Sequence, residues 1–226
     1  MGRAAGRTAQ RRAIVFDLDG TLIDSLPDIV ASFQDAFDAC GVRAPDEGAV
    51  RALIGRPLEE MYGTFSTDPA EVAALSAAYR RIYPRRFAER TRPFPGVPEV
   101  LAALRGRGWL LAVATTKRTE MATRLVAALG MEAQLDHVQG TDGFPHKPAP
   151  DVVQRALAVL GAEGAWMVGD TVSDLEAGRA AGLRTFGVTW GTQARARLAE
   201  ADPDALEDDL DRLPAWVGHP DGAALG

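Results

Sequence analysis

Residues 13–22 read AIVFDLDGTL, and the remaining segments are best understood by working outward from this stretch. Its first four residues are apolar and partly β-branched, which is typical of a fully buried strand. An Asp-Gly pair, which turns a chain sharply, follows at once. Asp17 and Asp19 therefore stand at the carboxyl end of a predicted strand, where open α/β sheets bind their ligands.

The two carboxylates indicate a metal site. Two like charges buried side by side are costly unless a cation joins them. Mg²⁺ is favoured, because it prefers hard oxygen ligands. Taken alone the pattern also fits a solvated turn, so the metal prediction depends on what other segments bring to this point.

From residue 93 onward the chain alternates between strand and helix patterns. Strands are predicted at 109–115, 137–139, 165–168 and 184–188, with a short last one at 205–206, and helices at 98–107, 118–129, 151–160 and 173–181. Such alternation is typical of βαβ units in a parallel sheet. We therefore predict an α/β fold with a Rossmann-like, mostly parallel sheet flanked by helices.

Residues 25–92 show helical patterns and no convincing strand. Helices are predicted at 27–40, 47–53 and 58–62, and a further helix from Pro69 should kink or end at Pro84. The predicted division is an α/β core of residues 1–24 and 93–226, with residues 25–92 inserted as an all-helical cap. An insertion at this point would lie over the metal site as a lid.

Lysine is rare in this chain, which has 23 arginines but only two lysines, Lys117 and Lys147. This bias suggests that a lysine is retained where arginine cannot replace it. Lys147 precedes Pro148 in a stiff loop, and we interpret it as a phosphate-binding candidate. An ordinary solvated loop lysine is the alternative. Lys117 is predicted at the exposed start of the helix that follows Thr115.

Three more polar residues are predicted at strand ends. Thr115 could hold a phosphate with its hydroxyl and the amides of the next helix, or be a plain N-cap. Asp170 follows the strand at 165–168. Asp174 is expected in the first turn of the next helix, which a capping box of Ser173 and Glu176 would start. For Asp170 and Asp174, helix capping alone is the alternative.

Together the four pieces D-x-D-G-T-L, strand-end Thr, Lys-Pro and G-D-x-x-x-D, in that order, closely resemble the haloacid dehalogenase superfamily. The resemblance extends over nearly the whole chain. The insertion is similar to the C1 cap of the phosphoglycolate phosphatase-like branch. The resemblance implies that Asp17 attacks phosphorus and becomes an aspartyl-phosphate. It implies that Asp19 protonates the leaving oxygen and then deprotonates the hydrolytic water.

The resemblance also implies the ligands of the site. Asp17, the backbone carbonyl of Asp19, and Asp170 would bind Mg²⁺, with Asp174 in support. Thr115 and Lys147 would bind the transferring phosphoryl group. This assignment agrees with simple electrostatics, because a carboxylate that attacks a phosphate dianion meets repulsion that Mg²⁺ and a lysine offset.

The rival activities of the superfamily differ in sequence. Dehalogenases generally lack the second aspartate, whereas Asp19 is present. Phosphonatases use a cap lysine, and residues 25–92 contain none. Gly169 stands where the β-phosphoglucomutase-like branch typically has glutamate. A Mg²⁺-dependent phosphatase acting on a small phosphate monoester is therefore predicted. A phosphomutase, a pyrophosphatase or nucleotidase, and a non-catalytic metal-binding domain are the alternatives.

The substrate is less well defined by the sequence. Arg56, in the predicted cap loop at 54–58, is a candidate contact for a substrate carboxylate such as that of phosphoglycolate. A surface arginine is an equal alternative. Thr116 stands where the family often has asparagine, and it is a second candidate contact.

Composition excludes several other classes of protein. A net charge of −6 argues against nucleic-acid binding, and no apolar run approaches membrane-spanning length. Cys40 is the only cysteine, so an internal disulfide is impossible and a reducing, cytoplasmic location is expected. The expected partner is a small phosphorylated metabolite, and the sequence does not indicate an oligomeric state.

Overall fold

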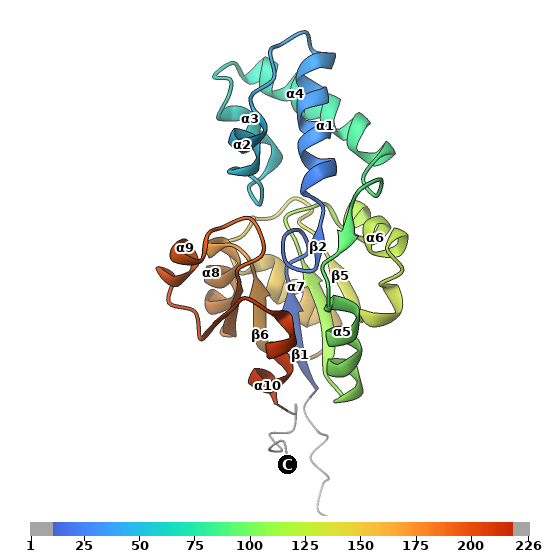
Figure 1. The fold of residues 1–226 in the computed structure, drawn as a ribbon, viewed down its shortest axis with the longest axis vertical. Coiled ribbons are helices and arrows are strands. Elements are labelled where there is room, and N and C mark those ends of the chain that lie inside the picture. The colour runs from blue at the N-terminus through green and yellow to red at the C-terminus, as the bar shows by residue number, and fades with distance from the viewer. Residues whose placement is uncertain (1–10, 219–226) are drawn as a thin grey trace, which may run out of the picture.

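The structure, a computed structural model, describes residues 11–218 and is built around a six-stranded parallel sheet. The strands lie in the order β5-β4-β1-β6-β7-β8 (Figure 1). Their bounds are Arg12–Phe16 (β1), Leu110–Ala114 (β4), His137–Gln139 (β5), Glu163–Gly169 (β6), Arg184–Val188 (β7) and Ala205–Glu207 (β8). The predicted α/β fold with a parallel sheet is confirmed, and β1 lies in the interior of the sheet between β4 and β6.

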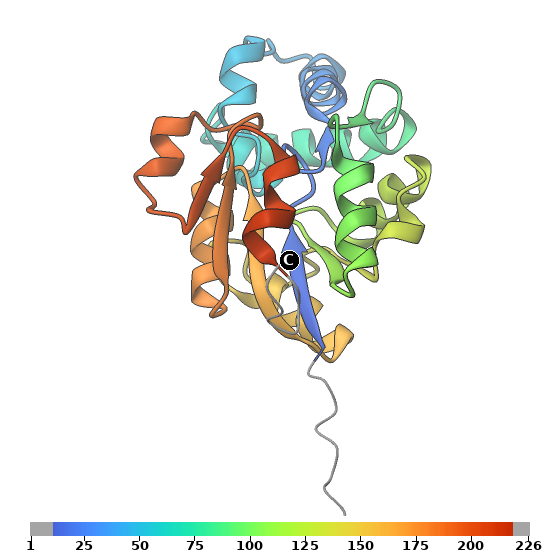
Figure 2. The ribbon, with the colours of Figure 1, turned by 60° about the horizontal axis from the view of Figure 1, so that its bottom comes forward.

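Successive side chains of β1 point to opposite faces of the sheet, and those on both faces are apolar. Helices therefore cover both faces. Ile14 and Phe16 belong to a large apolar cluster with α5 (Val97–Gly106), α6 (Thr119–Ala128) and α10 (Leu213–Val217). In Figure 2, red α10 and green α5 lie on the near side of the strands.

Val15 faces the opposite way, into a smaller apolar cluster. This cluster includes residues of α7 (Asp151–Leu160) and α8 (Val172–Ala180). Two short helices, α9 (Arg195–Ala199) and α10, were not predicted.

Four helices form a separate group above the carboxyl ends of the strands (Figure 1). They are α1 (Leu26–Ala39), α2 (Glu47–Arg51), α3 (Leu58–Gly63) and α4 (Pro69–Ile82). The group has its own apolar cluster, in which the rings of Phe33 and Tyr62 stack with centroids 4.0 Å apart. As predicted at Pro84, α4 ends and a 3₁₀ turn follows. We call this group the cap, and the division at residues 25 and 92 remains our proposal.

The two connections between the cap and the sheet domain run side by side. Ile23–Asp24 (β2) and Arg92–Pro93 (β3) pair antiparallel, although no strand was predicted at residue 92. Two-residue strands are too short to show an alternating pattern. The buried carboxylate of Asp28 strengthens the junction, because it accepts hydrogen bonds from the backbone of Arg90 and from the backbone and hydroxyl of Thr91. Among the described residues, no helix is long and apolar enough to cross a membrane.

Candidate active site

Asp17 directly follows β1, and its side chain is buried against Lys147. The ammonium nitrogen of Lys147 lies 2.5 Å from Oδ1 of Asp17 and 2.5 Å from Oδ1 of Asp174. It also donates to the carbonyl oxygen of Ala114, at the end of β4. Burial alone would lower the pKa of Lys147, but the charges of Asp17 and Asp174 outweigh it and raise that pKa. The lysine is therefore a fixed positive charge beside Asp17.

Asp174 reaches this lysine from the first turn of α8. Its Oδ2 accepts hydrogen bonds from the backbone and hydroxyl of Thr171, and Thr171 in turn caps the backbone of Asp174. The capping box is thus formed by Thr171 and Asp174, and the predicted pair of Ser173 and Glu176 was wrong. The helix begins one residue earlier than predicted because Thr171 has the extended backbone that an N-cap requires.

Asp170 follows β6 and is completely buried. Its Oδ1 accepts a hydrogen bond from the hydroxyl of Thr21, and its Oδ2 accepts from the backbone and hydroxyl of Thr192 at 2.7 Å each. Gly20 allows this approach: its φ is +87°, and a Cβ there would lie 2.4 Å from Oδ2 of Asp170. The Asp-Gly pair is therefore required by both the turn and the space beside Asp170.

The three aspartates form a group that could hold a metal ion. Ligand oxygens of Asp17, Asp170 and Asp174 all lie within 4.8 Å of one another. Three carboxylate charges against the one ammonium of Lys147 leave an excess of two negative charges in a buried cluster. The donor set and this excess both fit a divalent cation with a preference for oxygen ligands.

The pKa values of these carboxyls show the same imbalance. Burial raises the pKa of Asp17 well above its ordinary value; Lys147 opposes this, and the charges of Asp174 and Asp170 add to it. Burial, and next the charge of Asp174, also raise the pKa of Asp170. Both carboxyls are therefore disfavoured as anions until a further positive charge joins them.

Asp19 lies at the edge of this cluster, in the wall of a cavity between the cap and the sheet domain. The cavity has a volume of about 910 Å³, and Asp17, Asp19, Lys117 and Lys147 line it. Both carboxylate oxygens of Asp19 lie 2.8 Å from the ammonium nitrogen of Lys117, and the hydroxyl of Ser25 also donates to Asp19.

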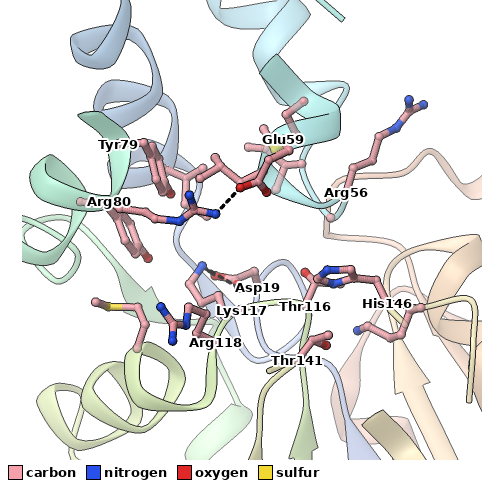
Figure 3. Close-up of a pocket in the computed structure, with 18 of the residues that line it drawn as sticks. Asp19, Arg56, Glu59, Tyr79, Arg80, Thr116, Lys117, Arg118, Thr141 and His146 are labelled. Atoms are coloured by element: carbon pink, nitrogen blue, oxygen red, sulfur yellow. Dashed lines mark hydrogen bonds and ion pairs between the residues drawn. The ribbon is translucent and has the colours of Figure 1, made fainter. Parts of the chain in front are cut away.

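The structure corrects the prediction for Lys117, which was expected at an exposed helix start. Its side chain is only 13% exposed, and it lies beside Asp19 (Figure 3). The helix begins at Thr119, so Lys117 belongs to the preceding turn, which faces the cavity. Both lysines of the chain are thus paired with the carboxylates of the DxD stretch.

The three remaining candidates, Thr115, Thr116 and Arg56, lie in different positions relative to the carboxylate cluster. Thr116 lines the cavity, whereas Thr115 is buried, and its hydroxyl oxygen accepts the backbone N–H of Lys117. Arg56 is exposed at the rim, and its side chain extends away from Asp19 (Figure 3). The structure therefore brings Asp17, Lys147, Asp170 and Asp174 together, with Asp19 beside them, but it does not bring the guanidinium of Arg56 to that group.

Residues 14–188 match a family described as haloacid dehalogenase-like hydrolase. The chain belongs to this family. It is 40% identical over 209 residues to a protein named probable phosphatase IndB from Dickeya dadantii, covering 88% of this chain and 90% of that protein. It is 36% identical over 191 residues to a protein named phosphoglycolate phosphatase from Aquifex aeolicus, covering 80% and 85%.

Solved structures of this family have the same fold. A haloacid dehalogenase-like family protein, SP0104 from Streptococcus pneumoniae, superimposes with a TM-score of 0.84 at 28% identity, over 93% of this chain and all of that one. The family resemblance predicted from the four sequence motifs is thereby confirmed.

Several residues of this haloacid dehalogenase-like site were missed by the sequence analysis, among them Thr21 and Thr171, which donate to Asp170 and Asp174. Ser25 and Thr192 contact Asp19 and Asp170, and Lys117 was noticed but misplaced. Thr192 follows β7 by four residues, so a search for polar residues after every predicted strand could have found it. No sequence signal distinguishes Ser25 from the other serines, because its role depends on where the cap leaves the sheet domain.

Proposed function

We propose that this protein is a Mg²⁺-dependent phosphatase that hydrolyses a small-molecule phosphate monoester through an aspartyl-phosphate on Asp17. The observation that carries the proposal is the contact between Asp17 and Lys147 within a buried carboxylate cluster that has two excess negative charges. A carboxylate next to a fixed ammonium can approach a phosphate dianion, because the ammonium offsets the repulsion between them.

The proposed reaction has two steps. In the first, an oxygen of Asp17 forms a bond to phosphorus while the bond from phosphorus to the ester oxygen breaks, and Asp19 donates a proton to that oxygen. In the second, Asp19 takes a proton from a water molecule that attacks the same phosphorus, which releases inorganic phosphate and free Asp17. Such proton transfers typically contribute roughly 10²- to 10⁴-fold to the rate.

The other residues hold the reacting groups. Thr115 and Lys147 are proposed to bind the transferring phosphoryl group. Asp17, Asp170 and the backbone carbonyl of Asp19 would hold Mg²⁺, with Asp174 in support. The metal would supply positive charge against the phosphoryl oxygens.

The proposed substrate is a phosphoglycolate-like monoester, and the relative named phosphoglycolate phosphatase supports this choice. A pyrophosphatase, nucleotidase or phosphomutase activity on the same site is the alternative. A non-catalytic metal-binding domain is a further alternative, but it would have no need of Asp19, Lys147 and Asp170 together. The composition and the single cysteine support a cytoplasmic enzyme of small metabolites rather than one of nucleic acids or membranes.

Release of inorganic phosphate in the presence of Mg²⁺ tests the proposal, with 2-phosphoglycolate, sugar phosphates, nucleotides and pyrophosphate as substrates. We expect Mg²⁺-dependent turnover of at least one of them, and a phosphorylated protein whose modified peptide contains Asp17. Turnover of none would overturn the proposed function, as would a phosphoryl group on another residue.

A further inference from the structure

Lys117 lines the cavity directly beside Asp19. Its ammonium nitrogen lies 2.8 Å from both oxygens of Asp19, the group proposed to protonate the leaving oxygen. It also lies 5.1 Å from the centre of the Tyr83 ring, which belongs to the cap. The lysine is thus held between Asp19 and the cap residue Tyr83.

Other positive side chains at the cavity are less suited to meet a leaving group. The side chain of Arg80 is 49% exposed and forms an ion pair with Glu59, and both extend from the cap (Figure 3). Arg56 is exposed and points away from Asp19. The side chain of Arg118 is 74% exposed. By contrast Lys117 is 13% exposed, so its charge is screened by water much less than theirs.

Tyr83, on the same side of the cavity, has a buried hydroxyl with no hydrogen-bond partner among the described residues. The residue as a whole is 3% exposed. Burial, and next the charge of Asp19, raise the pKa of Tyr83 well above its ordinary value. The hydroxyl therefore keeps its proton. A buried donor without a partner costs free energy, and a bound ligand would remove that cost.

We infer that Lys117 and Tyr83 bind an anionic group of the leaving group, close to the ester oxygen. The class of substrate is then a phosphate ester whose leaving group carries a carboxylate or a second phosphate next to that oxygen. This inference rests on the proposed phosphatase function and assigns the two residues that select its substrate. Both would touch the substrate directly.

The distances support this class. Asp19 must lie within hydrogen-bond distance of the leaving oxygen, roughly 2.6–3.2 Å, to give it a proton. The ammonium of Lys117 is 2.8 Å from Asp19. Only the Asp19 carboxyl group therefore separates this ammonium from the leaving oxygen. The carboxylate oxygens of a glycolate leaving group are three bonds from the ester oxygen, and those of a leaving phosphate are two. A cavity of about 910 Å³ is far larger than glycolate, so charge rather than size defines the class.

A pair of matched substrates isolates this charge. In 2-hydroxyethyl phosphate a neutral hydroxymethyl group replaces the carboxylate of 2-phosphoglycolate, and the rest of the molecule is the same. The readout is the ratio of kcat/KM for 2-phosphoglycolate to kcat/KM for the neutral analogue, with Mg²⁺ present. Lys117→Met should lower this ratio by about 30-fold, in line with loss of a charge-assisted hydrogen bond. Tyr83→Phe should lower it by about 10-fold, because only one donor is lost.

The control variants separate contact from general electrostatics. Arg56→Met removes a positive charge from the rim of the same cavity and should change the ratio by less than about twofold, since exposed charges are screened. Lys117→Arg keeps the charge and should retain more of the preference than Lys117→Met. Pyrophosphate, assayed in parallel, distinguishes a leaving phosphate from a leaving carboxylate, and Lys117→Met should slow its hydrolysis if the anion is a phosphate.

Failure of this inference differs from failure of the proposed function. If wild-type protein hydrolyses phosphate esters but does not prefer the anionic substrate of the pair, only the inference is overturned. The same conclusion follows if Lys117→Met slows both substrates equally, because Lys117 then acts only by positioning Asp19. If no ester is hydrolysed at all with Mg²⁺, the phosphatase function itself is wrong. Thermal unfolding of each variant shows that a changed ratio comes from folded protein.

Discussion

The ammonium of Lys147 lies 2.5 Å from Oδ1 of Asp174, while Oδ2 of the same carboxylate caps the first turn of α8. One side chain thus connects the start of a helix to the lysine beside the proposed nucleophile. Because each oxygen of Asp174 has a separate partner, the lysine is fixed by the helix as well as by its own loop.

Lys147→Arg tests whether this position needs a point charge. A guanidinium is longer, planar and forked, so it cannot occupy the buried space between Asp17 and Asp174. We expect kcat to fall on the order of 10²-fold, as for removal of a placed electrostatic group. Steady-state kinetics with the best substrate checks this.

The control is a swap of the same kind on the surface. Arg197 forms an exposed ion pair with Glu200, so Arg197→Lys should keep wild-type kinetics. Lys117 cannot serve as a control because it contacts Asp19. Wild-type kinetics in Lys147→Arg would contradict the proposed phosphate site.

Asp17→Asn tests the nucleophile. The amide is nearly isosteric with the carboxylate but cannot form the aspartyl-phosphate, so turnover should fall on the order of 10⁶-fold, as when the nucleophile of other covalent enzymes is removed. Phosphate release measures this, and mass spectrometry excludes deamidation. Substantial Mg²⁺-dependent turnover in an undeamidated sample would rule out Asp17 as the attacking group.

Metal removal tests the carboxylate cluster. Chelation by EDTA should abolish activity, and added Mg²⁺ should restore it, because the excess charge around Asp17 and Asp170 requires a cation. Ca²⁺ should restore it poorly, since its longer bonds and higher coordination number would displace Asp17. Activity that persists at full level in EDTA would show that the cluster is not a catalytic metal site.

Asp28→Asn should weaken the junction between cap and sheet domain. Burial alone would raise the pKa of Asp28, but hydrogen bonds from Arg90 and Thr91 outweigh it and lower the pKa below the ordinary 3.8. The side-chain amide of asparagine would place its N–H donors next to the N–H and O–H donors of Arg90 and Thr91, so that hydrogen bonds would be lost. We expect a loss of about 2 kcal/mol in the free energy of unfolding at neutral pH.

The pH dependence has a definite sign. Because the folded-state pKa of Asp28 is depressed, its contribution is fully present above 3.8 and is lost as pH falls through the lower folded value. The difference between wild type and Asp28→Asn in urea unfolding should thus shrink below about pH 4. Asp38→Asn, on the exposed side of the same helix, is the control. A difference that stays constant down to about pH 3 would show that the charge of Asp28 is not what stabilises the junction.

The sheet and its four aspartates were predictable because they depend on local patterns. An apolar run such as 13–16 forms a buried strand wherever it lies, and a parallel sheet brings the carboxyl ends of its strands to one edge. Asp17, Asp19, Asp170 and Asp174 follow such runs. Their proximity therefore follows from the alternation of strands and helices alone.

The misplaced residues depend on contacts between distant segments. Lys117 looks like the exposed start of a helix until the cap brings Tyr83 over it and the turn after β1 brings Asp19 beside it. Thr192 matters only because it lies against Asp170, which is 22 residues earlier. The capping box moved by two residues because Thr171 and Asp174 satisfy both the helix and Lys147, whereas Ser173 and Glu176 would satisfy the helix alone.

The placement of the cap between β1 and the rest of the sheet also fixes an order of events during synthesis. The cap cluster comes mainly from one continuous segment, so it can form as soon as the ribosome has passed Arg92. By contrast, β1 is made first and pairs with β4 and β6, which end at Ala114 and Gly169. The nucleophile-bearing strand can therefore pair with β4 when about half of the chain exists, but its second neighbour, β6, is complete only at three quarters. During synthesis the cap segment is therefore complete before the catalytic sheet, although the sheet begins first in the sequence.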